Sequence, residues 1–141
     1  TVGGVAVAAP KATPKHETGN AGELWAWSEG GRNLLALVVA KRHTNVPTQT
    51  GVEGSLLTQV EQAKGDLDKP DVSQLDVDVP GAKGSAGTAL QGSSKGVPVH
   101  QALVMFTDGD QTMYLVRLSV LRTKAGNALA DQIVHSLTLA G

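Results

Sequence analysis

Acid–base or metal chemistry in this chain would have to come from its four histidines and thirteen carboxylates, because it contains no cysteine. The histidines stand at positions 16, 43, 100 and 135, and none of their spacings places two imidazoles on one metal ion. We expect His16 to be solvated in a polar segment and His43 to lie in a basic cluster at a strand end. His135 falls in the last turn of an expected helix, where a cation interacts favourably with the helix dipole.

His100 is the histidine whose surroundings are most informative. The segment Thr107-Asp108-Gly109-Asp110 is the strongest hairpin signal in the chain. If the loop consists of Asp108 and Gly109, the strand register places His100 opposite Arg117. We interpret the two as a partly exposed surface pair, with a proton switch as the alternative.

Two glycine-rich segments partly match the sequence patterns of catalytic or phosphate-binding motifs, but they lack the flanking elements or residues that those motifs need. Gly92-Ser93-Ser94-Lys95-Gly96 reads as G-x-S-x-G, but a nucleophile elbow needs a buried strand before the serine and a helix after it. Here a Gly-rich stretch comes first and Val97-Pro98 opens a strand. The glycines from Gly81 to Gly87 lack the Lys-Ser/Thr ending of a phosphate loop. We interpret both segments as loop composition.

The aspartates do not form a recognisable metal site either. Pro70, and the absence of the required Gly and Glu, exclude a calcium loop in the segment 66–71. Asp76 and Asp78 fall on one face of an expected strand, where we expect water rather than a cation. The sequence therefore predicts no catalytic residue, no metal ligand and no cofactor.

Trp25 and Trp27 share one face of a strand and are open to two interpretations. They can anchor the core, or they can form an exposed aromatic contact of the kind that binding sites favour. With His100 and Arg117 they make up the candidate binding residues.

Composition narrows the function classes. The charges nearly cancel, with 12 Lys and Arg against 13 Asp and Glu, which excludes an electrostatic nucleic-acid binder. The longest apolar run, Leu34 to Ala40, is far shorter than the roughly 20 residues of a membrane-spanning helix. Only four residues are aromatic, so we expect a core of Val, Leu and Ala.

The first half of the chain predicts three strands and a helix. We expect an edge strand at Val5–Ala9, a polar loop at 11–21 and a hairpin of strands 23–28 and 33–40 joined through Gly30-Gly31. The strand at 33–40 is apolar at nearly every position, which is typical of a strand covered on both faces. Thr50 and Glu53 have capping-box spacing, and Val52, Leu56, Val60 and Ala63 recur at helical spacing up to Gly65.

The second half predicts further strands and a closing helix. The alternation from Leu75 to Val79 indicates a half-buried strand after a charged connection at 66–74. We expect 80–96 to be mostly mobile Gly-rich loop, with a short strand at 88–90. Strands 97–106 and 111–121 form the second hairpin. A helix at 127–137, capped by Asn127, precedes a brief strand or tail at 138–141.

These elements predict one α+β domain over residues 1–141, with a loosely ordered start at 1–20. Hairpins dominate, so the sheet is mostly antiparallel. Two amphipathic helices must bury their apolar stripes against it, one on each face, which gives an α/β/α sandwich.

The last part of the chain contains an expected hairpin, Val99-His100-Gln101-Ala102-Leu103 … Met113-Tyr114-Leu115-Val116, and then a helix that runs into Ile133-Val134-His135-Ser136-Leu137. This arrangement resembles the end of PsbP-like proteins. These α/β/α sandwiches include the photosystem PsbP subunit, a Ran-binding nuclear import factor, DcrB-like proteins and actinobacterial lipoproteins of the LpqN type. The family's P-x-x-W entry is missing, since Lys11-Ala12-Thr13 follow Pro10. The resemblance implies a binding or assembly module without a shared active site, and in the lipoprotein branch a lipid-bearing cysteine would precede Thr1.

We therefore expect a non-catalytic exported or cell-envelope binding domain, with a contact surface formed by Trp25, Trp27 and the loop 81–96. A first alternative is an adaptor or immunity-type protein that docks a secreted partner protein. A second is a small hydrolase that uses His100. The residues upstream of Thr1 would show whether a signal peptide or lipid anchor exists.

Overall fold

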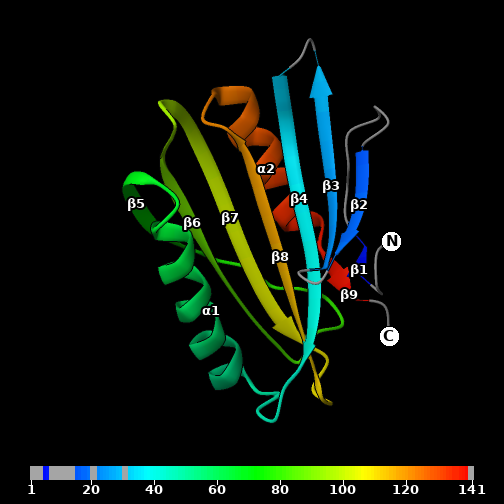
Figure 1. The fold of residues 1–141 in the computed structure, drawn as a ribbon. Helices are drawn as coiled ribbons and strands as arrows, with labels where there is room; N and C mark the ends of the chain where they lie inside the picture. The colour runs from blue at the N-terminus through cyan, green and yellow to red at the C-terminus, as the bar shows by residue number, and fades with distance from the viewer. Residues whose placement is uncertain (1–4, 7–14, 20–21, 30–31, 140–141) are drawn as a thin grey trace.

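A seven-stranded antiparallel sheet forms the centre of the fold in the computed structural model, which describes residues 5–6, 15–19, 22–29 and 32–139. Its strand order is β2-β3-β4-β8-β7-β6-β5 (Figure 1). The strands of this sheet are β2 (Lys15–Gly19), β3 (Gly22–Glu29), β4 (Arg32–His43), β5 (Asp68–Leu75), β6 (Gly84–Ser94), β7 (Val97–Thr107) and β8 (Thr112–Leu121). The helices are α1 (Gln49–Lys64) and α2 (Lys124–Ser136), and β1 (Val5–Ala6) pairs separately with β9 (Thr138–Leu139).

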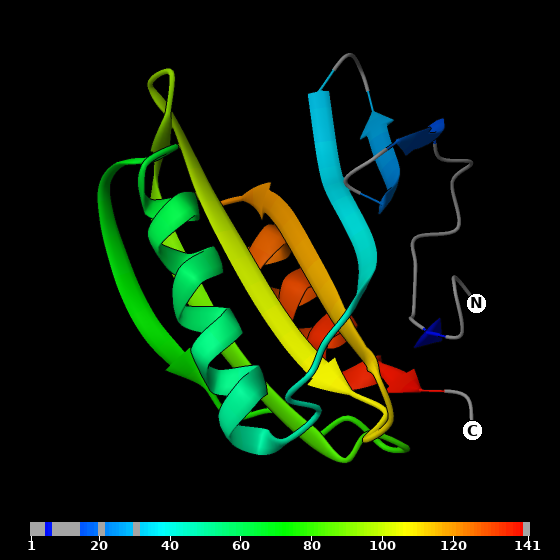
Figure 2. The same cartoon turned by 60° about the horizontal axis from the view of Figure 1, so that its bottom comes forward.

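The two helices lie on opposite faces of the sheet (Figure 2). Alternation along β7 shows this directly, because Leu103 and Met105 pack with α1 while Val104 and Phe106 pack with α2. The predicted α+β fold with a mostly antiparallel sheet is confirmed, and so is a helix on each face.

Helix α1 begins earlier than predicted. Its N-cap is Thr48, whose hydroxyl oxygen accepts a hydrogen bond from the Gly51 amide at 3.2 Å, so Thr50 lies inside the helix. The predicted apolar stripe is confirmed as the buried face, and Gly65 ends the helix as predicted. Leu57, beside that stripe, is 68% exposed.

Helix α2 also begins before its predicted cap. Thr123 caps it, with the Gly126 amide donating to the hydroxyl oxygen at 3.0 Å. Asn127 is therefore not the cap, and its side chain lies within the first turn, toward the sheet. After the helix a brief strand or a tail was expected, and residues Thr138–Leu139 form the strand β9.

The segment expected to be a mobile Gly-rich loop is mostly strand β6, which pairs with β5 and β7 on its two sides. Its glycines serve close packing. A Cβ on Gly87 would lie 3.2 Å from the Cβ of Leu75, and one on Gly92 would lie 3.0 Å from the carbonyl oxygen of Asp68. Glycine richness here reflects contact between neighbouring segments and not chain flexibility.

The strand predicted at Leu75–Val79 is displaced. Strand β5 ends at Leu75 and occupies most of the predicted charged connection. The alternation that suggested a strand is nevertheless real, since Val79 is buried and Asp76 and Asp78 are exposed.

The register of the second hairpin differs from the prediction. His100 pairs with Val120 and Leu103 pairs with Arg117, three positions further along β8 than a two-residue loop allows. The buried Thr107 hydroxyl explains the longer loop: it donates to the Thr112 carbonyl at 2.8 Å and accepts from the Gly109 amide at 3.1 Å. Because the displacement is an odd number of residues, each side chain of β8 lies on the opposite face of the sheet from the one predicted relative to β7.

The first part of the chain adds an edge strand that was not predicted. Residues 15–19, expected to be polar loop, form β2 beside β3. The hairpin of β3 and β4 is confirmed, with Glu29 paired to Arg32, while its Gly30-Gly31 turn lies outside the described residues. Strand β4 is buried at Leu35, Leu37 and Val39, toward α2, and only half-buried at Ala36 and Val38. The expected cover on both faces is therefore incomplete.

Candidate functional site

A pocket of about 160 Å³ lies between α2 and the strands β5, β6 and β7. We call it the α2 pocket. Its apolar wall consists of Leu75, Ala102, Ala130 and Val134. Its polar lining consists of Gln91, His100, Asn127 and Asp131. An apolar cavity with a few convergent polar groups is the usual form of a small-molecule site.

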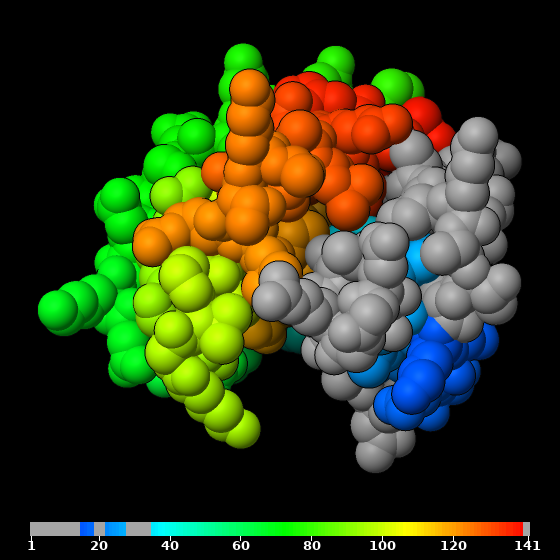
Figure 3. All heavy atoms as spheres, turned by 90° about the horizontal axis from the view of Figure 1, so that it is seen from above, coloured from blue at the N-terminus to red at the C-terminus, as the bar shows by residue number. Residues whose placement is uncertain are grey.

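The connection between β8 and α2 positions the helix over this part of the sheet. The Arg122 amide donates to the Pro98 carbonyl at 3.1 Å, which ties the start of α2 to the start of β7. Figure 3 looks onto this end of the molecule and shows the β6–β7 turn, in yellow-green, beside the orange start of α2. The pocket therefore has a fixed helix on one side and a paired sheet on the other.

Gln91 and His100 are cross-strand partners whose side chains form a hydrogen bond in the pocket wall. Gln91 Nε2 lies 3.2 Å from His100 Nδ1. Because an amide nitrogen can only donate, Nδ1 accepts and the ring proton lies on Nε2. Burial lowers the pKa of His100 below its ordinary value, so the ring is neutral at pH 7.

Asn127 carries an unsatisfied acceptor. Its Oδ1 is buried, and no described residue donates a hydrogen bond to it. An acceptor left in this state costs about 1–3 kcal/mol of folding free energy. Such an atom in a folded protein needs an explanation. Because the oxygen is buried from solvent, a ligand could donate to it only after the side-chain amide has rotated.

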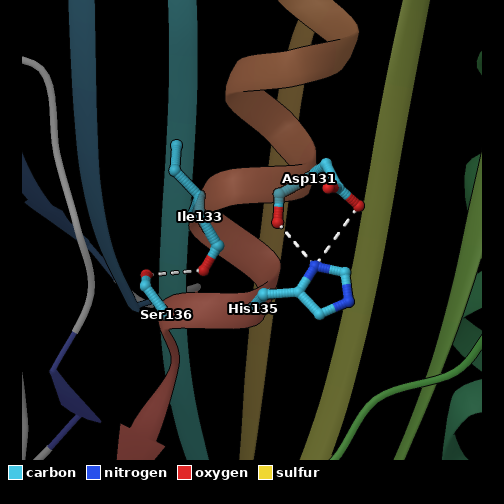
Figure 4. Close-up of polar contacts among 4 residues, drawn as sticks. All are labelled: Asp131, Ile133, His135 and Ser136. Carbon is cyan, nitrogen blue, oxygen red and sulfur yellow. Dashed lines mark hydrogen bonds and ion pairs between the residues drawn. The ribbon is translucent and has the colours of Figure 1, made fainter.

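Among the residues that the structure describes, Asp131 supplies the only carboxylate in the pocket lining. Figure 4 shows the His135 ring turned toward it, with His135 Nδ1 2.8 Å from the Asp131 carbonyl oxygen and 3.2 Å from its carboxylate. Both contacts are with acceptors, so Nδ1 carries a proton. His135 thus lies in the last turn of the helix as predicted, and it partly engages the carboxylate.

The predicted pairing of His100 with Arg117 is wrong, because the two side chains lie on opposite faces of the sheet. His100 faces α2, whereas Arg117 lies on the α1 face and pairs with Leu103. Arg117 Nη2 lies 3.4 Å from Gln101 Oε1 and 3.7 Å from an Asp66 carboxylate oxygen. Arg117 therefore contributes nothing to the α2 pocket.

The expected contact surface of Trp25, Trp27 and the loop 81–96 does not form. Trp27 is a core residue, only 3% exposed. Trp25 is half-buried and stacks on His16, with ring centroids 4.3 Å apart. Three strands, β4, β8 and β7, separate β3 from β6, which holds most of the glycines.

The remaining sequence motifs are structural. Lys95 and Gly96 of the G-x-S-x-G segment have φ angles of 52° and 80° and form the turn between β6 and β7. His43 is exposed and contacts Asn45 Oδ1 at 3.0 Å. No group of three or more His, Asp or Glu side chains within the described ranges is placed to hold a metal ion.

A larger, shallower hollow of about 470 Å³ lies where β4 ends beside the β7–β8 turn. Lys41, Arg42 and His43 line it, and all three are exposed. Exposed side chains on the protein surface do not make a preorganised site, so we take the α2 pocket as the candidate site.

Sequence reasoning found one of the four polar residues of this pocket, His100. A signal for two others existed, because Asn127, Ala130, Asp131 and Val134 recur at helical spacing on one face of α2. Gln91 had no local signal, since only the pairing of β6 with β7 brings it to His100.

Comparison with protein-family models and with curated protein sequences finds no match for this chain. No helix in the described part of the chain is both long enough and apolar enough to cross a bilayer.

Proposed function

We propose that this chain is a non-catalytic binding domain and that its ligand occupies the α2 pocket. The observation that carries the proposal is the Gln91–His100 hydrogen bond. A catalytic histidine is normally oriented by a carboxylate that stabilises the imidazolium, or it contacts a hydroxyl nucleophile. An amide that donates to Nδ1 does neither. It holds a neutral ring in one orientation, which suits recognition.

The PsbP-like resemblance supports the same class of function. An antiparallel sheet with a helix on each face is compatible with that family, whose members are binding and assembly modules. The resemblance to its lipoprotein branch is also the basis for proposing that the domain works outside the cytoplasm, in the cell envelope or secreted.

Filling the pocket tests the proposal. Ala130→Leu adds a side chain to the pocket wall, while Ala128→Leu makes the same change at an exposed position of the same helix. With benzyl alcohol as probe, amide shifts of β7 and α2 should move in the wild type and in Ala128→Leu but not in Ala130→Leu. Ala102→Val, which fills the pocket from the sheet, serves as a second variant if Ala130→Leu unfolds. Shifts that are absent in the wild type, or that persist in both filled variants, contradict the proposal.

The hydrolase alternative is checked with the wild type and two further variants. Turnover of p-nitrophenyl acetate that His100→Gln abolishes, and that His43→Gln leaves intact, would overturn a binding-only function. We expect no difference among the three proteins.

A further inference from the structure

We infer that the α2 pocket recognises a small primary amine with an apolar body, the polar end being the ammonium group. This inference rests on the proposed function, because it assigns the chemistry of the ligand to the same pocket. Three properties of the pocket support it: the charge of the lining, its hydrogen-bonding groups and its size.

The charge of the lining favours a cation. Within the described part of the chain, the lining contains the carboxylate of Asp131 and neither a lysine nor an arginine. Its one titratable base, His100, accepts a hydrogen bond at Nδ1 and is neutral. A carboxylate or phosphate ligand would meet a negative charge without a positive partner, whereas an ammonium would meet an opposite charge.

The hydrogen-bonding groups match an ammonium as well. Gln91 uses its amide nitrogen on His100, which leaves its Oε1 as an acceptor. Asp131 has a second carboxylate oxygen besides the one near His135. Asn127 Oδ1 has no donor among the described residues, and rotation of its amide about the terminal side-chain bond, a soft torsion, would turn this oxygen toward a ligand. An ammonium group has three donors and no acceptor, so it complements three such oxygens.

The volume limits the apolar body. A pocket of about 160 Å³ is close in size to the cavity of about 150 Å³ that holds benzene in an engineered protein core. One ring or a short branched chain therefore fits beside Leu75 and Val134. Benzylamine has this size and carries one primary amine.

The experiment compares three probes of the same shape: benzylamine, benzyl alcohol and benzoate. Their dissociation constants are measured by NMR titration at pH 7.5. We expect benzylamine to bind about three-fold more tightly than benzyl alcohol, because a charge pair that is this exposed is weak, and benzoate to bind least. Asp131→Asn should remove the preference for the amine and leave the affinity for the alcohol unchanged.

A matched variant controls for the loss of one negative charge. Glu61→Gln neutralises a carboxylate on α1, and the Glu61 side chain is 73% exposed, as is that of Asp131. It should keep the full amine preference. Asn127→Leu should weaken binding of both the amine and the alcohol, since both donate a hydrogen bond.

The outcomes separate the two proposals. If benzyl alcohol binds in the pocket as tightly as benzylamine, or if Asp131→Asn keeps the preference, the amine inference is wrong and the binding domain stands. If none of the three probes binds, the proposed function fails.

Discussion

Gln91 and His100 face each other across β6 and β7, with Gln91 Nε2 3.2 Å from His100 Nδ1. The pair forms part of the wall of a pocket that α2 closes from the other side. Burial lowers the pKa of His100, the only half-buried histidine among the described residues, and the hydrogen bond from Gln91 defines its tautomer. The contribution of His100 to stability should therefore depend on pH.

Replacing His100 should change how stability depends on pH. Burial lowers the pKa of folded His100, so the unfolded chain takes up a proton first as the pH falls below about 6.5. The wild type should therefore lose free energy of unfolding between pH 7.5 and pH 5.5 relative to His100→Gln. Urea denaturation at several pH values measures this, with His43→Gln as a control for removing an exposed histidine. A difference between wild type and His100→Gln that does not vary with pH contradicts the prediction.

Asn127→Leu should stabilise the free protein. The substitution removes an acceptor without a donor and adds a residue with higher helix propensity, together worth about 1 kcal/mol or more. Chemical denaturation measures the change, and Asn127→Asp, which adds a charge at the same place, should destabilise. A large loss of stability in Asn127→Leu would mean that the amide makes bonds that the fold requires.

Removing the hydroxyl of a helix N-cap should cost more stability than removing a nearby hydroxyl inside the helix. Thr48→Ala and Thr123→Ala each remove an acceptor for a helix-start amide, which should cost about 1 kcal/mol. Thr50→Ala, one residue inside α1, should cost much less. Thermal unfolding compares the stabilities of the three variants. Equal losses of stability in Thr48→Ala and Thr50→Ala would show that Thr48 is not the N-cap of α1.

Two glycines should respond to alanine in opposite directions. On exposed Gly54 of α1 a new Cβ meets no atom within 4 Å, so Gly54→Ala should stabilise by about 0.5–1 kcal/mol. On Gly87 a new Cβ would lie 3.2 Å from side-chain atoms of both Leu75 and Val77. Gly87→Ala should therefore destabilise, because β5 must move away from β6. If both variants are stabilised in denaturant titrations, close packing does not explain the glycine in β6.

Local patterns in the sequence determined which segments become helix and hairpin. Val52, Leu56, Val60 and Ala63 predicted the buried face of α1, and the two hairpins were recognisable from alternation and turn residues. These features depend on residues a few positions apart, so a short window of sequence contains the relevant physics.

Tertiary structure decided the register of the second hairpin, and with it the site. The buried Thr107 hydroxyl lengthens the loop between β7 and β8, which turns Arg117 to the α1 face while His100 faces α2. Glycines in β6 had the same local appearance as a flexible loop, although two of them, Gly87 and Gly92, pack closely against β5. The α2 pocket combines Leu75, Gln91, His100 and Asn127 from four separate elements. No local spacing in the sequence predicts that these residues lie together, because they do so only after the strands have paired and α2 has packed on the sheet.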